Sequence, residues 1–141
     1  MAIHAYLLDT NIISALAREP QGAVYRVLKE RLPATACTSI VVASEIEYGL
    51  CKSGSRRLRT QVETILSALD VLPLEAPVDR HYGEIRAYLQ RIGQPIGYND
   101  LFIAAHARSL GLILVSRNTG EFERVPDLKT ENWLELRNHI G

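Results

Sequence analysis

A short apolar run that ends in a carboxylate constrains this chain more than any other feature. Tyr6-Leu7-Leu8 is followed by Asp9, by the small polar residues Thr10 and Asn11, and then by the helical pattern Ile12-Ile13-Ser14-Ala15-Leu16. The pattern predicts a buried strand that delivers Asp9 to the edge of a sheet, where a helix begins. Because ligands bind at that carboxyl edge in open α/β sheets, Asp9 is the first candidate site residue.

Strand-like and helix-like segments alternate along the rest of the chain. The expected strands cover residues 3–8, 35–39, 71–74 and 112–116, with a further edge strand at 129–132. The expected helices cover residues 10–18, 21–31, 41–52, 56–69, 77–92, 98–110 and 133–139. Such alternation predicts a three-layer α/β/α fold around a mostly parallel central sheet. Since no linker or repeat interrupts it, we expect residues 1–141 to form a single domain.

Composition narrows the class of protein without naming a partner. Apolar residues make up 47% of the chain, which favours a globular protein. The longest apolar runs are too short to cross a membrane, and the first eight residues lack the features of a signal peptide, so we expect a cytoplasmic protein. Sixteen basic residues balance sixteen acidic ones, so only local patches could favour a nucleic acid. Cys37 and Cys51 have no ligand-type spacing and are expected to be reduced thiols.

Four acids fall near the ends of the predicted elements. Asp9 ends the first strand, and Glu45 lies one turn into the helix after the second strand. Asp100 opens the apolar helix 98–110, and Glu121 follows the fourth strand. The topology of a parallel sheet can direct all four to one edge. A carboxylate near a core is costly to bury alone, so these acids are expected to be paired or to hold a metal ion.

Each acid also has a simpler interpretation. Asp9 and Asp100 could cap the helices that begin beside them. Glu45 and Glu121 could favour helix N-termini electrostatically. Together the four are harder to explain in this way, because Asp9 directly follows a buried strand and Asp100 precedes a helix too apolar for the surface. For His106 we expect a packing or surface role, since nothing pairs it with a nucleophile.

Four stretches of the chain resemble those of PIN-domain ribonucleases of the VapC toxin type. They are Leu7-Leu8-Asp9-Thr10-Asn11, Ala43-Ser44-Glu45-Ile46-Glu47-Tyr48-Gly49, Ile96-Gly97-Tyr98-Asn99-Asp100-Leu101-Phe102-Ile103-Ala104-Ala105-His106-Ala107 and Leu114-Val115-Ser116-Arg117-Asn118-Thr119-Gly120-Glu121-Phe122. The tail Val125-Pro126-Asp127-Leu128 into Trp133 is also similar to that subgroup. The similarity runs nearly end to end, and four stretches in this order are far more specific than the first alone. The resemblance implies a PIN-like fold.

The resemblance also carries roles to particular residues. Asp9, Glu45 and Asp100 match the family's metal-site acids, and Glu121 matches a fourth acidic position where many members have Asp. All four are expected to be catalytic and to hold the metal, with the longer Glu121 suited to act through water. The residues expected to support the acids or to contact substrate are Thr10, Ser116, Arg117 and Asn118. Carboxylate oxygens suit Mg²⁺ or Mn²⁺, and no sulfur or histidine cluster suggests zinc.

The expected activity is divalent-metal-dependent endoribonuclease cleavage. Metal-activated water would attack the RNA phosphodiester in line, and the family resemblance implies a 5′-phosphate and a 3′-hydroxyl product. The resemblance further implies transfer RNA as substrate, a homodimer, and a cognate VapB-type antitoxin that masks the acidic pocket. Helices 41–52 and 56–69 could offer that antitoxin an apolar groove, or could simply be core faces.

Two basic features could hold RNA. Arg117 lies beside the predicted acids and is the best single candidate for a phosphate contact. The densest basic cluster comprises Lys52, Arg56, Arg57 and Arg59. It could contact phosphates or could be a solvated helix start.

Two rival classes remain open at this point. A phosphatase could use Asp9 as a nucleophile, although that chemistry usually wants a second acid two residues on, where Asn11 stands. A catalytically silent PIN-like module could bind only RNA or protein. The retained acids argue against that class, because repelling carboxylates have no purpose in a silent site.

Overall fold

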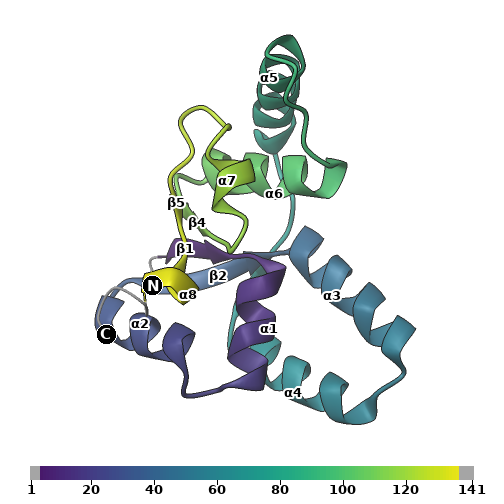
Figure 1. The fold of residues 1–141 in the computed structure, drawn as a ribbon, viewed down its shortest axis with the longest axis vertical. Coiled ribbons are helices and arrows are strands. Elements are labelled where there is room, and N and C mark those ends of the chain that lie inside the picture. Colours follow the sequence, from purple (N-terminus) through teal and green to yellow (C-terminus); the bar gives the residue numbers. More distant parts are fainter. Residues whose placement is uncertain (1–3, 137–141) are drawn as a thin grey trace.

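The computed structural model describes residues 4–136 of the chain (Figure 1). One parallel sheet lies at its centre, with strands in the order β3-β2-β1-β4-β5. The strands are β1 His4–Leu8, β2 Thr35–Ser39, β3 Asp70–Leu72, β4 Ile113–Val115 and β5 Thr130–Glu131. All four strand pairings are parallel, which confirms the predicted sheet. The strand predicted before Pro73 lies at one edge, as a residue without an N–H donor requires, and the last predicted strand lies at the other.

Helices cover both faces of this sheet and complete the predicted three layers. They are α1 Thr10–Arg18, α2 Ala23–Arg31, α3 Ile40–Ser53, α4 Arg56–Ser67, α5 Val78–Arg91, α6 Tyr98–Ser109, α7 Thr119–Phe122 and α8 Trp133–Leu136. In Figure 1, α5 and α6 lie on one side of the sheet, and α1 and α2 lie on the other. Most predicted bounds agree within two residues. The short helix α7 was predicted only as a turn, and residues 3 and 137–139 of two predicted elements lie outside the described residues.

The buried centre of the fold explains why the site forms where it does. Strand β1 is flanked by β2 and β4, and its Leu7 and Leu8 are fully buried. Helix α6 buries Leu101 and all residues from Ile103 to Ala107, so the prediction that it is covered on most sides is confirmed. It ends before Gly111, whose φ of 68° is the left-handed conformation that favours glycine at a helix end. The carboxyl ends of β1 and β4 meet at Asp9 and Ser116, which share a hydrogen bond, and the carboxyl end of β2 contacts α6 through Ser39 and His106.

Two other predictions are settled by the described residues. Phe122 is fully buried, as expected of a core anchor. Cys37 and Cys51 are both free thiols, the first buried and the second exposed. No helix in residues 4–136 is long and apolar enough to span a membrane.

Candidate metal centre

The central strand delivers Asp9 to the edge of the sheet, where hydrogen bonds fix both of its carboxylate oxygens. The side chain is only 3% exposed. Its Oδ1 accepts a hydrogen bond from the Thr10 backbone N–H at 2.8 Å, so Asp9 also serves as the N-cap of α1. Its Oδ2 accepts one from the Ser116 hydroxyl at 2.7 Å. Capping, the simpler interpretation of Asp9, is therefore real, but it uses only one oxygen of a buried carboxylate.

Glu45 reaches the same place from α3. That helix begins directly after β2, with the Ser39 side chain accepting a hydrogen bond from the Val41 N–H at its start. Glu45 Oε1 accepts a hydrogen bond from the Thr10 hydroxyl at 3.1 Å, and its Oε2 lies 3.5 Å from the Asn99 side-chain nitrogen. The carboxylate thus bridges the first turns of α1 and α6.

Asp100 lies in the first turn of α6 and interacts electrostatically with the other three acids. Burial, then the negative charges of Glu121 and Asp9, a hydrogen bond with Glu121 and the charge of Glu45 raise the pKa of Asp100 to about 7. Burial also raises the pKa of Asp9, against the hydrogen bonds from Ser116 and Thr10 and with the charges of Glu45 and Glu121. The structure therefore brings the four predicted acids together into one group of mutually repelling carboxylates.

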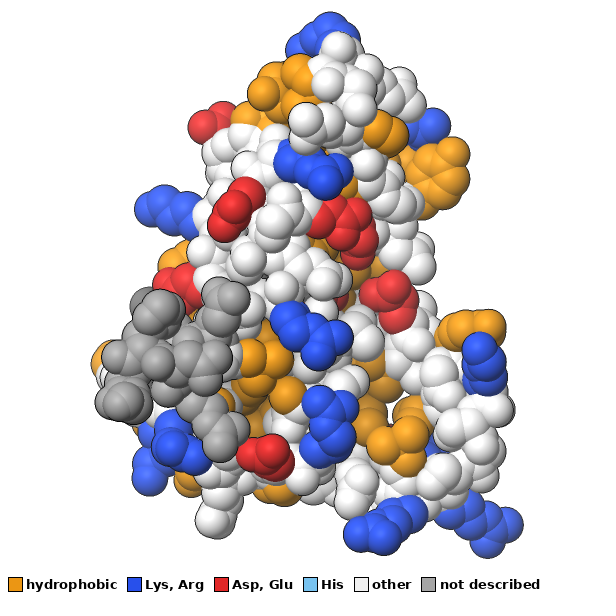
Figure 2. Space-filling model, viewed as in Figure 1, with side chains coloured by type: hydrophobic (Ala, Val, Ile, Leu, Met, Phe, Trp, Pro, Cys, Tyr) orange, Lys and Arg blue, Asp and Glu red, His pale blue; other side chains and the backbone are white. Residues whose placement is uncertain are grey.

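No positive charge compensates these acids within residues 4–136. Every ion pair that the described residues form involves other carboxylates. In Figure 2, acidic side chains gather near the middle of the molecule, with basic ones above and below them. Asp9 is buried and the other three acids are partly buried. A group of carboxylates without a cationic partner among the described residues suits a hard divalent cation, which binds oxygen ligands.

The acids are close enough to interact but are not yet arranged as a ready ligand set. Among the described residues, no three His, Cys, Asp or Glu side chains form a group that could hold a metal ion as they stand. The donor chemistry of the four acids fits Mg²⁺ or Mn²⁺, because both ions prefer carboxylate oxygens.

The residues predicted to support the acids contribute in different ways. Ser116 is fully buried; its hydroxyl donates to Asp9 and accepts from the Asn118 backbone N–H at 3.0 Å. Asn118 thus supports Ser116 through its main chain. The predicted support or substrate role of its side chain stays a prediction. Arg117 is exposed, and its backbone N–H donates to the Asn11 side-chain oxygen at 2.9 Å. None of the ion pairs among the described residues involves its guanidinium.

Two asparagines belong to the site but were not among the predicted site residues. Asn11 ties the start of α1 to the segment after β4, and Asn99 faces Glu45. Asn99 directly precedes Asp100, Asn11 lies two residues after Asp9, and both asparagines are at the start of a helix. Their positions were visible in the sequence, but their partners lie 106 and 54 residues away, which no local pattern reveals.

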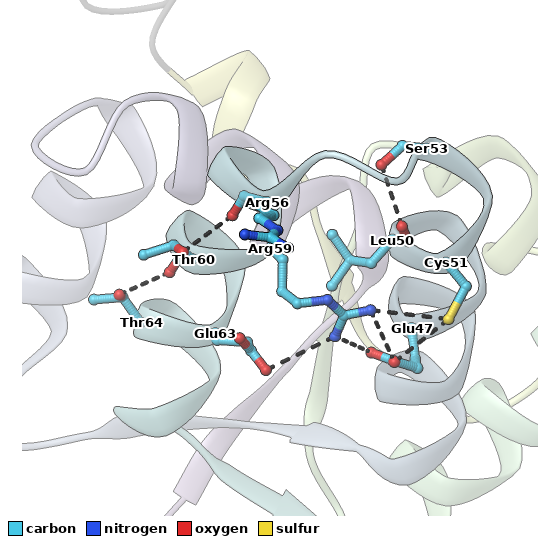
Figure 3. A network of polar contacts seen from close by, with 9 residues as sticks. All are labelled: Glu47, Leu50, Cys51, Ser53, Arg56, Arg59, Thr60, Glu63 and Thr64. Carbon is cyan, nitrogen blue, oxygen red and sulfur yellow. Dashed lines mark hydrogen bonds and ion pairs between the residues drawn. The ribbon is translucent and has the colours of Figure 1, made fainter.

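His106 and Glu47 lie outside the site, as predicted. His106 is 2% exposed; its Nδ1 lies 2.8 Å from the Ser39 hydroxyl, and it also hydrogen bonds with the Pro73 backbone. Burial lowers the pKa of His106. Of the two predicted roles, packing or surface, the burial of the side chain confirms packing. Glu47 instead pairs with Arg59 of α4 (Figure 3).

The predicted basic cluster is only partly available for RNA. Arg59 reaches from α4 to α3, where its guanidinium donates to both Glu47 oxygens at 3.0 and 3.1 Å, and it also pairs with Glu63 at 3.8 Å (Figure 3). Arg59 thus clamps two helices together. Lys52, Arg56 and Arg57 remain exposed at this turn.

Comparison with known proteins agrees with this geometry. Residues 6–128 match the family described as PIN domain. Ribonuclease VapC2 of Haemophilus influenzae is 44% identical over 131 residues, which cover 92% of this chain and 98% of the relative. The tRNA(fMet)-specific endonuclease VapC of Shigella flexneri is 42% identical over 130 residues, covering 91% of this chain and 97% of the relative. The crystal structure of VapBC2 from Rickettsia felis bound to a promoter DNA fragment contains a chain that superposes with a TM-score of 0.83 at 34% identity, covering 92% of this chain and 98% of that one.

These matches span the four acids and nearly the whole chain. The chain therefore belongs to the PIN-domain family and, within it, to the VapC ribonucleases.

Proposed function

We propose that this chain is a divalent-metal-dependent endoribonuclease and the toxin of a toxin–antitoxin pair. The observation that carries the proposal is the group of four acids, Asp9, Glu45, Asp100 and Glu121, which lies at the carboxyl edge of the sheet and has no compensating positive charge within residues 4–136. Membership of the VapC ribonucleases makes RNA the substrate class. It also favours nuclease chemistry over the rival phosphatase and over a silent binding module.

Asp9 and Asp100 would be the inner ligands of Mg²⁺ or Mn²⁺. When bound, such an ion lowers the pKa of a water and offsets charge on the phosphoryl oxygens. Ser116 and Thr10 hold the Asp9 carboxylate in one orientation, so its position is set before substrate arrives. The raised pKa of Asp100 means that deprotonation of this acid, which loading of the site requires, is complete only above about pH 7 in the metal-free protein.

Glu45 and Glu121 complete the site from two other elements. Glu45 is anchored by the Thr10 hydroxyl, and Glu121 lies in α7, close enough to share a hydrogen bond with Asp100. We assign to them the orientation of water and the acceptance of its proton. The exposed Arg117 would contact a substrate phosphate at the rim, where a guanidinium suits phosphate geometry.

Transfer RNA is the proposed substrate. The Shigella flexneri relative is named a tRNA(fMet)-specific endonuclease. At 42% identity over nearly the whole chain, this name is the most specific guide to substrate.

A VapB-type antitoxin is the proposed protein partner. The Rickettsia felis neighbour was solved as a VapBC complex. Apolar side chains show in a hollow between α1 and the arm formed by α3 and α4 in Figure 2, and Leu58 on α4 is 37% exposed. That arm is where we place the antitoxin. A homodimer and a cytoplasmic location remain predictions.

RNA cleavage by purified protein tests the proposal. Wild type should cut transfer RNA in Mg²⁺ or Mn²⁺ and should stop in EDTA, and Asp9→Asn should be inactive in both. Glu47→Gln is the matched control, because Glu47 is an acid of the same helix as Glu45 that points to Arg59 instead. Cleavage that persists in EDTA or in Asp9→Asn would contradict the proposal. A covalent aspartyl-phosphate on Asp9 would restore the phosphatase.

A further inference from the structure

A hollow of about 690 Å³ opens directly beside the acids. Its walls come from α3, from α6 and from Leu74 in the segment after β3, and two of its lining residues, Thr10 and Glu45, also belong to the acidic site. A nucleotide next to the scissile phosphate at the acidic site would therefore lie over this hollow.

The hollow has an aromatic and apolar lining. Tyr48 follows Glu45 by three residues, so the two side chains are neighbours on the surface of α3. It is 69% exposed, which is unusual for a side chain of this size. Phe102, on the opposite wall, is held in place by stacking on Tyr82, with ring centroids 4.5 Å apart and an interplanar angle of 29°. Such surfaces accept the flat face of a nucleobase.

Two polar side chains stand beside these rings. The Ser44 hydroxyl donates to the Ile40 carbonyl at 2.8 Å, and its oxygen keeps lone pairs that can accept a hydrogen bond. Asn99 carries both a donor and an acceptor on its amide. These groups are of the kind that pair with the edge of a base.

The charge of the residues that line the hollow favours a base over a phosphate as its occupant. None of the described residues that line it is basic, and one, Glu45, is acidic. A phosphate would be repelled there, whereas an uncharged base would not.

We propose that this hollow binds an unpaired nucleobase adjacent to the scissile phosphate, with Tyr48 as its stacking platform. The proposal rests on the ribonuclease function above and adds a requirement on the substrate. The cut must fall in an unpaired segment of the RNA, because a base stacked in a duplex cannot enter the hollow.

The test combines a change in the protein with a change in the RNA. After the cleavage site has been mapped, three synthetic RNA hairpins that contain it are compared. One is intact, one lacks the base of the nucleotide on the 5′ side of the cut, and one lacks the base on the 3′ side. One abasic hairpin should be cut at least about fivefold more slowly by wild type, as expected for the loss of one stacked base. Tyr48→Ala should cleave the intact hairpin more slowly than wild type by a similar factor. The same abasic nucleotide should then slow cleavage by Tyr48→Ala only a little further.

Controls make every outcome informative. Tyr25→Ala removes another partly exposed tyrosine, on α2, and should match wild type on all three hairpins. Circular dichroism should show Tyr48→Ala folded, and the abasic hairpins test the hollow without any protein change. If the slowing caused by Tyr48→Ala multiplies with the slowing caused by the abasic nucleotide, the two act independently and the base site is overturned. It is also overturned if neither change slows cleavage. A third result would also overturn it. If Tyr48→Ala cleaves RNA like wild type but binds the antitoxin more weakly or changes its oligomeric mass, the hollow serves a protein contact instead. If wild type cuts the intact hairpin no faster than Asp9→Asn does, the proposed function itself fails.

Discussion

The acidic edge of the sheet and the clamp between α3 and α4 use the same kinds of charged residue in opposite ways. At the clamp, Arg59 pairs with Glu47 and Glu63 at the surface (Figure 3). At the acidic edge, the Asp9 carboxylate is buried beside three like charges, and burial and repulsion raise its pKa. The charges at the clamp are paired with each other, whereas no positively charged side chain among the described residues pairs with the four acids.

The difference indicates which region serves the fold and which serves the chemistry. Exposed ion pairs contribute little to stability, because water screens them. Clustered buried carboxylates cost stability, and a protein retains them where they bind something. Changes at the acids should therefore affect activity strongly, and changes at the clamp should hardly affect it.

The largest effect is expected for the inner acids. Asp9→Asn and Asp100→Asn keep the side-chain shape but remove a charge that, in the proposed function, would hold the cation. RNA cleavage should fall by roughly a thousandfold or more while the fold persists, a loss of the size seen when a main electrostatic contributor is removed. Glu47→Gln should cleave within about twofold of wild type, in line with the usual neutrality of surface changes. If all three variants lost the same amount of cleavage activity, the acidic edge and the clamp would not differ in their role.

A smaller loss is expected for the residue that orients Asp9. Ser116→Ala removes the 2.7 Å hydrogen bond to Oδ2 and leaves that oxygen buried. Mn²⁺ affinity or cleavage should fall about 10- to 100-fold, as is typical when a partner of a metal ligand is lost. Ser109→Ala is the control, because the Ser109 hydroxyl donates to the His106 carbonyl at the far end of α6, away from the acids. Unchanged Mn²⁺ affinity in Ser116→Ala would show that Asp9 needs no such support.

Stability without metal should depend on pH in a particular direction. The pKa of Asp100 is raised from 3.8 to about 7 in the folded chain, so the folded state binds this proton more tightly than the unfolded state does. Its contribution to stability is complete below about pH 4 and is lost as pH rises through about 7. In EDTA, Asp100→Asn should therefore melt at a higher temperature than wild type at pH 8, and the gap should close at pH 4. A gap that does not vary with pH would contradict the repulsion.

The smallest effect is expected at the clamp. Arg59→Ala removes pairs that lie at the surface, so the melting temperature should fall only slightly, and less in high salt, where such pairs are already screened. Its cleavage rate should match that of wild type. A large loss of cleavage would instead place Arg59 in RNA binding, as the sequence-based interpretation of the basic cluster allowed.

Much of the fold was predictable because it rests on local patterns. Buried runs such as Tyr6-Leu7-Leu8, helical spacing, and the breaks at Pro73 and Gly111 are all written in neighbouring residues. The short helix α7 was missed because four residues carry too little periodicity to distinguish a helix from a turn.

The grouping of the four acids was predictable, but the contacts around them were not. Sheet topology and the family resemblance together named the four acids. Neither could reveal that Asn11 accepts from the Arg117 backbone, that Asn118 acts through its N–H, or that Arg59 is engaged by Glu47. These contacts join segments far apart in the chain, and they depend on the final packing of the elements.

Calorimetric titration of Mn²⁺ into the EDTA-stripped, dialysed protein at pH 8 tests the central claim most directly. Wild type and Glu47→Gln should bind with the same affinity, and Asp9→Asn and Asp100→Asn should show little or no binding. Absence of binding by wild type, or equal binding by all four proteins, would contradict the claim that these acids form a metal centre.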